Sequence, residues 1–319
     1  MSNSISPEAA AKPLFIVNPM SGGGRTRRRI GTLVDAIERA GLEADMVFTT
    51  HRGHGEDLAR EAIEAGREFL VACGGDGTVF EVANGIMALT AQDRVRLGTI
   101  GMGTGKDVAK CLGLGRAAAA LRAITAGFER RVDIGKVTSR GPDGNNLVRY
   151  FLLEASAGWV PEISQSTPRW LKRLGDTAPY MIVTGFKLAG PMGRPFTLSI
   201  DGQQADGRYN SISVHNMELW GGDLVAAPGA SPDDGLLDVI RWGDLGRVAV
   251  LKAVAGQRKG GTHLDMDGVD RHPAKAIELS SPKPTRLDLD GELGGYLPAR
   301  IEIVPGAIRF AAPAPSANL

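Results

Sequence analysis

The stretch 69–78, Phe-Leu-Val-Ala-Cys-Gly-Gly-Asp-Gly-Thr, predicts a buried strand followed by a glycine-rich turn. The five leading apolar residues favour a strand inside the protein. Glycine allows backbone conformations that a Cβ forbids, so another molecule can approach the main chain closely. Free N–H groups at the start of the helix that Thr78 opens favour an anion such as phosphate. The sequence therefore predicts a phosphate-binding loop, because a plain strand-to-helix turn does not need three glycines around one carboxylate.

Two further glycine-rich loops have the same place between a strand and a helix. Residues 97–100 form an apolar strand candidate, and Gly-Met-Gly-Thr-Gly at 101–105 follows it. Near the N-terminus, a strand at 14–17 runs into Asn-Pro-Met-Ser-Gly-Gly-Gly at 18–24, and apolar residues at helical spacing predict a helix at 25–40. Because ligands bind beyond the carboxyl ends of parallel strands, three such loops predict a binding site in an open α/β sheet.

Two common phosphate-binding motifs are absent from the sequence. The dinucleotide motif G-x-G-x-x-G would need a final glycine, but counting from Gly101 it ends at Lys106 and counting from Gly103 it ends at Val108. The Walker A motif fails as well, because its spacing is one residue short and Asp107 stands where Ser or Thr is required. A nicotinamide oxidoreductase and a P-loop ATPase are both disfavoured.

The chain changes character after about residue 134. Before this point strand and helix patterns alternate, which is typical of a parallel sheet. Beyond it strand patterns separated by Asp-Gly turns dominate, which predicts an antiparallel, all-β sandwich with a helical insertion near 162–190. We therefore expect an α/β nucleotide-binding domain at 1–134 and a mainly β domain at 135–298.

The composition argues against several classes of protein. Lysine and arginine number 37 against 36 aspartates and glutamates, and this balance disfavours a nucleic-acid-binding protein. The two cysteines, Cys73 and Cys111, have no CxxC partner, which indicates a reducing compartment without a disulfide framework. No apolar stretch reaches transmembrane length and no signal peptide is visible, so we expect a cytoplasmic protein.

A series of short sequence blocks runs in order through almost the whole chain. The blocks are Asn-Pro-Met-Ser-Gly-Gly at 18–23, Gly-Gly-Asp-Gly-Thr at 74–78, Glu-Val-Ala-Asn-Gly at 81–85, Gly-Thr-Gly at 103–105 with Asp107, Val-Asp-Ile-Gly-Lys-Val at 132–137, Gly-Gly at 221–222, Ala-Pro at 227–228, Asp-Asp-Gly-Leu-Leu-Asp at 233–238 and Asp-Gly-Glu at 290–292. As an ordered set they resemble the diacylglycerol kinase catalytic-domain family, in the bacterial branch that includes sphingosine-kinase-like proteins. Gly-Gly-Asp-Gly-Thr alone is shared with NAD kinases and phosphofructokinases.

This resemblance implies an ATP-dependent kinase that phosphorylates a lipid hydroxyl with the help of Mg²⁺. It implies an NAD-kinase/phosphofructokinase-like first domain, to which residues 299–319 return, and a second domain that receives the lipid. The active site would lie in the cleft between the domains. Such an enzyme would meet its lipid substrate peripherally at the membrane surface, and an exposed sheet edge could pair two chains into a homodimer.

The resemblance assigns nucleotide-binding residues to the three glycine-rich loops. Asp76 is expected on the nucleotide and Mg²⁺ side, directly or through water, because Mg²⁺ prefers oxygen ligands. Lys106 stands where the family usually has Asn, and it could either contact a phosphate or be a solvated residue at a helix start. The other residues expected to contact the nucleotide are Asn18, Ser21, Gly74, Gly75, Gly77, Thr78, Gly103, Thr104 and Gly105.

The resemblance also places catalysis in the Asp-Gly-Glu block. Asp290 would accept the hydroxyl proton, with Glu292 beside it. Residues i and i+2 of a strand face the same side, so the two carboxylates could share a site, where crowding of like charges would raise one pKa. The alternative is an ordinary Asp-Gly turn. A separate loop is expected to hold a structural Mg²⁺ through Asp234 and the carbonyls of Ser231 and Leu236, and here the alternative is an Asx turn without a metal.

Several positions depart from the family pattern and leave other functions open. Besides Lys106, the differences lie at 157–161, at His-Asn-Met 215–217 and at 220–223. The lipid could be diacylglycerol, a sphingoid base, a ceramide or phosphatidylglycerol. The alternatives are an NAD-kinase-like enzyme with a soluble substrate and a catalytically weak nucleotide-binding regulator.

Overall fold

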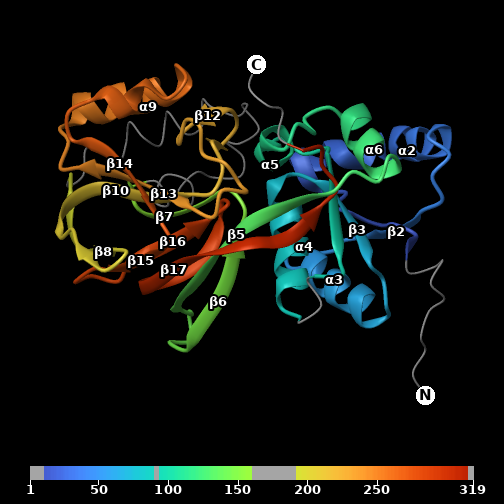
Figure 1. Ribbon diagram of the computed structural model, residues 1–319, viewed down its shortest axis with the longest axis horizontal. Helices are drawn as coiled ribbons and strands as arrows, with labels where there is room; N and C mark the ends of the chain where they lie inside the picture. The colour runs from blue at the N-terminus through green and yellow to red at the C-terminus, as the bar shows by residue number, and fades with distance from the viewer. Residues whose placement is uncertain (1–10, 90–92, 160–191, 315–319) are drawn as a thin grey trace. The chain divides into compact units, whose positions relative to one another are not determined.

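The chain forms two compact units in a computed structural model that describes residues 11–89, 93–159 and 192–314. One unit consists of Met1–Val132 with Gly306–Leu319, and the other of Asp133–Pro305 (Figure 1). The first is an α/β unit and the second is mainly β, as the sequence predicts. The predicted helical insertion near 162–190 lies outside the described residues.

The first unit is built on parallel strands. These are β1 (Leu14–Val17), β2 (Asp45–Phe48), β3 (Phe69–Gly74) and β4 (Arg96–Gly101), in the order β4-β3-β1-β2. The helices between and after them are α2 (Ser21–Arg39), α3 (His54–Glu64), α4 (Asp76–Met87), α5 (Asp107–Cys111) and α6 (Ala117–Thr125). Strands β1 and β3 are buried along their whole length, as near-continuous apolar runs in a sheet covered on both faces should be.

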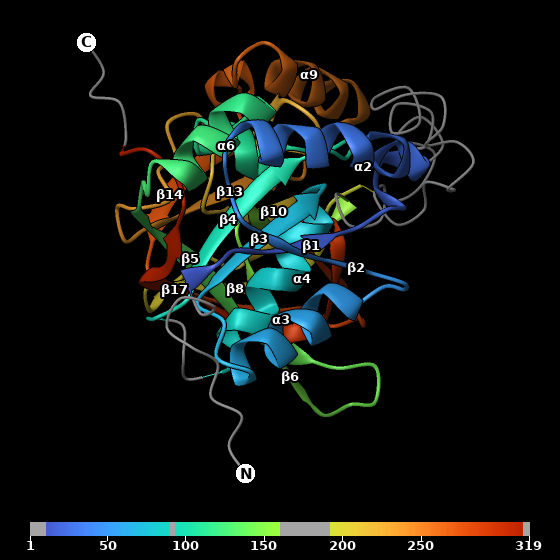
Figure 2. The same ribbon diagram turned by 90° about the vertical axis from the view of Figure 1, so that its right-hand side faces the viewer.

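The order of the strands makes the chain reverse its direction at β1. The connection through α2 leads to β2 on one side of β1, and the connection through α3 leads back across β1 to β3. Because crossover connections between parallel strands are right-handed, the reversal sends the helices to opposite faces of the sheet. Figure 2 shows α2 and α6 on one face and α3 and α4 on the other.

The second unit contains antiparallel strands. They are β5 (Arg130–Arg140), β6 (Asn146–Phe151), β7 (Glu154–Gly158), β8 (Arg194–Ile200), β9 (Gln203–Gln204), β10 (Gly207–His215), β13 (Leu237–Gly243), β14 (Val269–Ala274), β15 (Ala276–Ser280), β16 (Arg286–Leu289) and β17 (Glu292–Phe310), with a small hairpin of β11 (Leu219–Trp220) and β12 (Leu224–Val225). Strands β5 and β17 have residues in both units.

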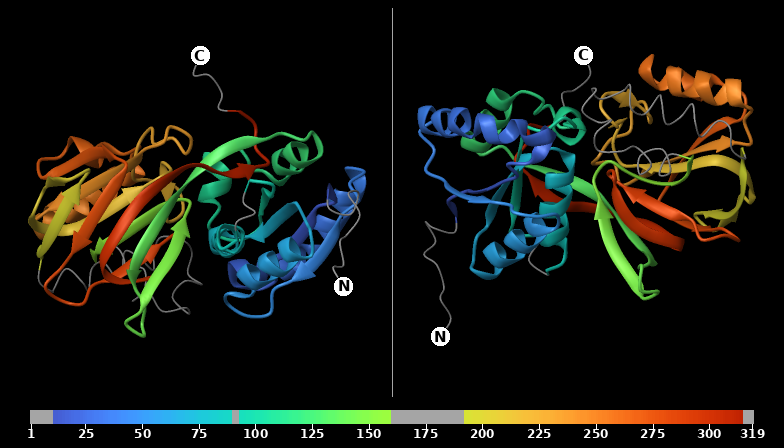
Figure 3. Two further views of the ribbon diagram at one scale, coloured as in Figure 1. Left: turned by 60° about the horizontal axis from the view of Figure 1, so that its bottom comes forward. Right: turned by 180° about the vertical axis from the view of Figure 1, so that it is seen from behind.

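Strands β10 and β17 of the second unit each belong to two rows of hydrogen-bonded strands. One row is β14-β13-β10-β7-β16-β17, and the other joins β10 to β8, β8 to β15 and β15 to β17. The register of β10 shifts between Tyr209 and Ser211, where it changes partners, and strands that switch sheets commonly do so at such irregularities. Helix α9 (Arg247–Arg258) follows β13 and covers one face of the sheet, as the orange helix in Figure 3 shows.

The chain returns to the first unit at Gly306, whereas we expected the return to begin at 299. Residues 299–302 pair with Ala276–Leu279 of β15, so backbone hydrogen bonds hold them in the second unit. Arg309 and Phe310 then pair in parallel with Arg96 and Leu97 of β4. The other boundary lies between Val132 and Asp133, close to the expected residue 134. Among the described residues, no helix has the length and apolarity needed to cross a bilayer.

Candidate active site

Two of the glycine-rich loops leave the sheet of the first unit where its direction reverses. The loop after β1 leads to α2 and the loop after β3 leads to α4, and these two helices lie on opposite faces (Figure 2). In open α/β sheets, ligands bind at the carboxyl ends of the strands, where adjacent connections diverge in this way. The loop after β4 lies at the same edge, next to the loop after β3.

The loops after β3 and β4 touch through their main chains. Gly74 O accepts hydrogen bonds from the N–H groups of Met102 and Gly103, at 2.7 and 2.9 Å. A Cβ added at Gly103 would lie 2.6 Å from the Cα atom of Gly75, and one at Gly74 would lie 2.2 Å from Thr78 Oγ1. Glycine is therefore required at these positions by contacts inside the protein, before any ligand is considered.

Polar side chains connect the first loop to the other two. Asn18 Nδ2 donates to Thr78 Oγ1 at 3.3 Å, and the hydroxyls of Ser21 and Thr26 share a hydrogen bond of 2.5 Å. Arg25 donates to the Thr104 hydroxyl at 2.6 Å. The structure thus brings Asn18, Ser21, Thr78 and Thr104, all expected to contact a nucleotide, to one edge of the sheet.

Three successive glycines lie between β1 and the regular part of α2. Gly22, Gly23 and Gly24 have φ values of 61°, 68° and 85°, a left-handed conformation that is costly for residues with a side chain. No atom lies within 4 Å of a Cβ built at Gly23 or Gly24, so the backbone conformation alone demands glycine there. Successive N–H groups in such a turn can point toward one anion.

Asp76 has a partner within the protein. Its carboxylate accepts hydrogen bonds from the N–H groups of Asp107 and Val108, both at 3.1 Å. These are the first residues of α5, so Asp76 caps that helix from the neighbouring loop. A Cβ at Gly105 would lie 2.6 Å from Asp76 Oδ2, and the side chain of Lys106 packs against Gly101. Gly77 lies in the first turn of α4.

In the second unit, Asp290 occupies a turn between β16 and β17 with a φ of 52°. Its carboxylate accepts three backbone hydrogen bonds, from the N–H groups of Leu152 at 2.8 Å and of Leu153 and Glu154 at 2.9 Å. Our strand-based expectation that Asp290 and Glu292 face the same side is wrong, because Asp290 belongs to a turn and only Glu292 begins a strand. The spacing of Asp290 and Glu292 in the sequence therefore does not place their side chains on one face of a strand.

The carboxyl groups that crowd Asp290 are Glu154 and Asp288, with exposed fractions of only 2% and 1%. Burial, with a smaller contribution from the charge of Asp288, raises the pKa of Asp290 to about 6, against the effect of its three N–H donors. Burial, followed by the charges of Asp288 and Asp290, raises the pKa of Glu154 well above its usual range. Neither Glu154 nor Asp288 was among the predicted site residues, although each is a carboxylate flanked by apolar residues in a strand pattern.

The loop expected to hold a metal forms an Asx turn. Asp234 Oδ1 accepts the Leu236 N–H at 2.9 Å, and the Ser231 hydroxyl donates to Asp233 at 2.7 Å. Asp133 accepts the Gly235 N–H at 2.7 Å. Within the described part of the chain, no group of three or more His, Cys, Asp or Glu residues is placed to hold a metal ion. Oxygen atoms of the kind that Mg²⁺ binds are present, so the metal stays a prediction.

Comparison with known proteins finds family models that match each of the two units. A family model described as the diacylglycerol kinase catalytic domain matches residues 12–137, and one described as the YegS C-terminal NAD kinase beta sandwich-like domain matches residues 156–312. Diacylglycerol kinases of Staphylococcus aureus (strain bovine RF122 / ET3-1) and Bacillus subtilis (strain 168) are each 31% identical over 289 residues. The alignments cover 89% of this chain and 87% and 90% of those proteins.

Solved structures show the same fold. The crystal structure of a diacylglycerol kinase from Bacillus anthracis str. Sterne aligns with a TM-score of 0.70 at 22% identity, over 96% of this chain and 98% of that one. A second crystal structure from that organism aligns with a TM-score of 0.78 at 24% identity, over 96% of this chain and 99% of that one.

Alanine substitutions at Gly103, which lies in the contact between the loops, and at Gly31, which lies outside it, should change the stability of the protein in opposite directions. G103A should lower the free energy of unfolding by about 1–3 kcal/mol, because the new methyl group overlaps the backbone of Gly75. G31A should raise it by about 0.4–1 kcal/mol, since Gly31 is exposed inside α2 with no atom within 4 Å of the added Cβ. Denaturant unfolding followed by circular dichroism measures both. Unchanged stability in G103A would contradict the loop contact.

Proposed function

Because this chain belongs to the diacylglycerol kinase family of lipid kinases, we propose that it transfers the γ-phosphoryl group of ATP to the hydroxyl of diacylglycerol or a related lipid, with Mg²⁺. The observation that carries the proposal is the half-buried carboxyl group of Asp290, held by three backbone N–H groups with its pKa near 6. A carboxylate in this setting suits a general base at neutral pH.

Asp290 has the properties that proton acceptance requires. A pKa of about 6 leaves it ionised near pH 7 and still basic enough to take a proton from a hydroxyl group. A carboxylate offers about four lone-pair positions, and three of those of Asp290 accept backbone N–H groups. The backbone therefore fixes the orientation of the carboxylate and leaves about one position for the hydroxyl proton. Glu292, the other residue of the block, begins β17 and is half-buried.

The first unit would bind the nucleotide. The left-handed glycines at 22–24, together with the loop glycines at 74, 75, 77, 103 and 105, would let phosphate oxygens approach the main chain closely. The N–H groups of Gly24 and Gly103 donate to Met20 O and Gly74 O, so these two residues would give access and not a donor. Asn18, Ser21, Thr78 and Thr104 would add polar contacts, and Lys106 a positive charge. Mg²⁺, when bound, neutralises phosphate charge during transfer. Asp76 would face it directly or through water.

The reaction is tested by phosphate transfer from labelled ATP with Mg²⁺ to a panel of acceptors. The panel contains diacylglycerol, a sphingoid base, a ceramide and phosphatidylglycerol in mixed micelles, and NAD in solution. Transfer to one lipid would support the proposal and name the substrate. Transfer to NAD alone would favour the soluble-substrate alternative, and ATP binding without any transfer would favour the regulator.

Asp290→Asn should lower kcat by roughly 10²–10⁴, because the amide cannot accept the proton. In the wild type the rate should fall below pH about 6, as Asp290 becomes protonated. The matched control is Asp201→Asn. Asp201 also has a positive φ, 47°, and its carboxylate also accepts two backbone N–H groups, those of Lys275 and Ala276, at up to 3.2 Å. Equal losses in both variants would show that Asp290 acts only on the structure.

The loop at 231–236 would hold a structural Mg²⁺ through Asp234 and neighbouring oxygens. If so, Mg²⁺ should raise the midpoint of thermal unfolding in the absence of nucleotide, since a ligand of the native state stabilises it. Asp234→Asn should remove most of this rise. Asp206→Asn is the control, because Asp206 also accepts a backbone N–H, that of Leu198 at 2.9 Å, outside this loop. An identical rise in the wild type and Asp234→Asn would refute the site.

The outer face of α9 has the composition of a membrane-contact surface. Val248 and Leu251, three residues apart and so on one side of the helix, are 66% and 39% exposed. The cations Lys252, Arg258 and Lys259 are exposed in the same segment. Apolar side chains beside cations suit an anionic lipid surface. We propose that this face meets the membrane that contains the lipid substrate.

The double substitution V248S/L251S should weaken binding to vesicles of phosphatidylglycerol and phosphatidylcholine by roughly tenfold, because two apolar side chains no longer leave water. Vesicle sedimentation measures this without any kinase reaction. V148S is the matched control, since Val148 is 45% exposed on β6. If V248S/L251S and V148S bind equally well, α9 is not the contact surface.

A further inference from the structure

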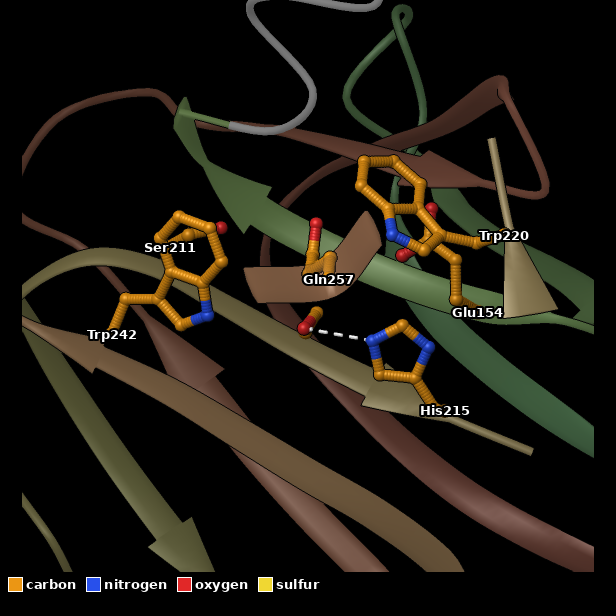
Figure 4. A pocket seen from close by; sticks show the side chains of 7 residues that line it. Glu154, Ser211, His215, Trp220, Trp242 and Gln257 are labelled. Atoms are coloured by element: carbon orange, nitrogen blue, oxygen red, sulfur yellow. Dashed lines mark hydrogen bonds between the residues drawn. The ribbon is translucent and has the colours of Figure 1, made fainter. Parts of the chain in front are cut away.

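A small cavity lies inside the second unit, next to the carboxyl cluster formed by Glu154, Asp288 and Asp290. Its volume is about 10 Å³, and the side chains around it come from β7, β10, β11, β13 and α9 (Figure 4). The lining residues are Glu154, Ser211, Ser213, His215, Trp220, Trp242 and Gln257. Glu154 and His215 stand directly opposite each other in the pairing of β7 with β10, so their side chains share one face of the sheet.

Three buried polar atoms of these residues have no hydrogen-bond partner within the described part of the chain. They are Glu154 Oε2, His215 Nδ1 and Trp220 Nε1. Glu154 and His215 are 2% and 1% exposed, so bulk water does not reach them. Most buried polar groups in native proteins have a partner. Three unpaired atoms around one cavity therefore point to a small polar molecule that contacts all of them.

The hydrogen-bonding capacity of the three groups matches one water molecule. Trp220 Nε1–H can only donate. Burial lowers the pKa of His215 to about 3, so the ring is neutral. Its Nε2 lies 2.9 Å from Ser213 Oγ, and with the proton on Nε2 the ring leaves Nδ1 as an acceptor. A water molecule would accept from Trp220 and donate to His215 and to Glu154 Oε2, and a cavity of about 10 Å³ has room for a single one.

The neighbours of Glu154 favour its protonated form. Asp288 and Asp290 both lie close enough for their charges to raise the pKa of Glu154. Carboxyl groups crowded together in a poorly solvated place do not all ionise, so one of them keeps its proton. The other titratable groups of this region include His215 on β10, which is neutral, and His263 on η2 (Thr262–Asp265). Arg271 on β14 forms an ion pair with Asp238 on β13, which stands opposite His215. His263 and Arg271 both act on His215.

The backbone of Glu154 also holds Asp290. Its N–H donates to Asp290 Oδ1 at 2.9 Å, and its carbonyl accepts the Asp290 N–H at 3.1 Å. A change in the position of Glu154 would therefore move the carboxylate that we propose as the base. An ionised Glu154 would also place a second negative charge beside it.

We propose that Glu154 is a protonated positioning residue, which shares one internal water molecule with His215 and Trp220 and leaves Asp290 as the ionised carboxylate that faces the lipid hydroxyl. The water site depends only on the second unit, whereas the effect on catalysis rests on the proposed kinase function. His215 belongs to the block 215–217, one of those where the sequence departs from the family pattern.

The variants E154Q and E154L separate the role of the hydrogen bonds of the Glu154 side chain from that of its volume. E154L should lower kcat roughly tenfold or more, with the KM for ATP unchanged, because Asp290 loses its support. E154Q, which imitates the protonated acid, should recover most of this loss. In the wild type the rate should also fall at alkaline pH as Glu154 ionises, and this fall should be absent from E154Q. A larger loss in E154Q than in E154L would overturn the proposal.

Stability against pH tests the protonation without any kinase assay. A carboxyl group with a raised pKa stabilises the folded protein at low pH, and this contribution is lost as the pH rises from the unfolded value of about 4.3 through the folded pKa. The thermal midpoint of E154Q should therefore rise relative to that of the wild type over this range. Parallel curves would mean that Glu154 is not protonated in the folded protein.

A crystal structure tests the water molecule directly. Density for one water within hydrogen-bond distance of Glu154, His215 and Trp220 is expected, and a dry cavity would overturn this part of the proposal. If the wild type phosphorylates no lipid, the proposed function fails, while the stability comparison and the crystal structure still decide whether Glu154 is protonated and the cavity holds water.

Discussion

The second unit depends on one carboxylate that binds three backbone N–H groups. Asp290 joins the turn between β16 and β17 to the bend between β6 and β7, through Leu152, Leu153 and Glu154. These donors favour the charged form, while burial and Asp288 oppose it, and the balance leaves the pKa near 6. The same hydrogen bonds therefore stabilise the chain and orient the group that we propose as the base. The Asp290 carboxylate has both a structural and a proposed catalytic role, so the effect of a substitution at Asp290 must be compared with that of a matched structural control.

A second constraint acts in the first unit, where main chains approach closely. Gly103 lies against Gly75, and Gly74 accepts two N–H groups from the loop after β4. Asp76 caps α5 from across this contact. Gly74, Gly103 and Gly105 thus also have a reason inside the protein to be glycine. The phosphate-binding loop and the packing of the loops are satisfied by the same residues, and the reversal of strand order at β1 places them at the edge where ligands bind.

Buried charge links the carboxyl cluster to the small cavity. Glu154, Asp288 and Asp290 cannot all be ionised at such short range, because like charges in a poorly solvated place repel strongly. For Glu154, burial and the charges of both neighbours all raise the pKa. Its pairing with His215 across β7 and β10 extends the polar region beyond the cluster, toward Trp220. The titration of one group is therefore coupled to the packing of several strands.

The sequence by itself determined the class of each unit, the three strand–loop–helix sites and the family, because apolar periodicity, glycine clusters and ordered motifs are local in the chain. It also singled out Asp290 and Asp76, but not their partners: the N–H donors of Asp290 lie 136 to 138 residues away and those of Asp76 about 31. The prediction that Asp290 and Glu292 face the same side of a strand was wrong, because the chain turns at Asp290, where φ is positive. Only the tertiary structure brought Glu154, Asp288 and His215 together, because the pairing of β7 with β16 and β10 is a long-range contact that no local pattern encodes.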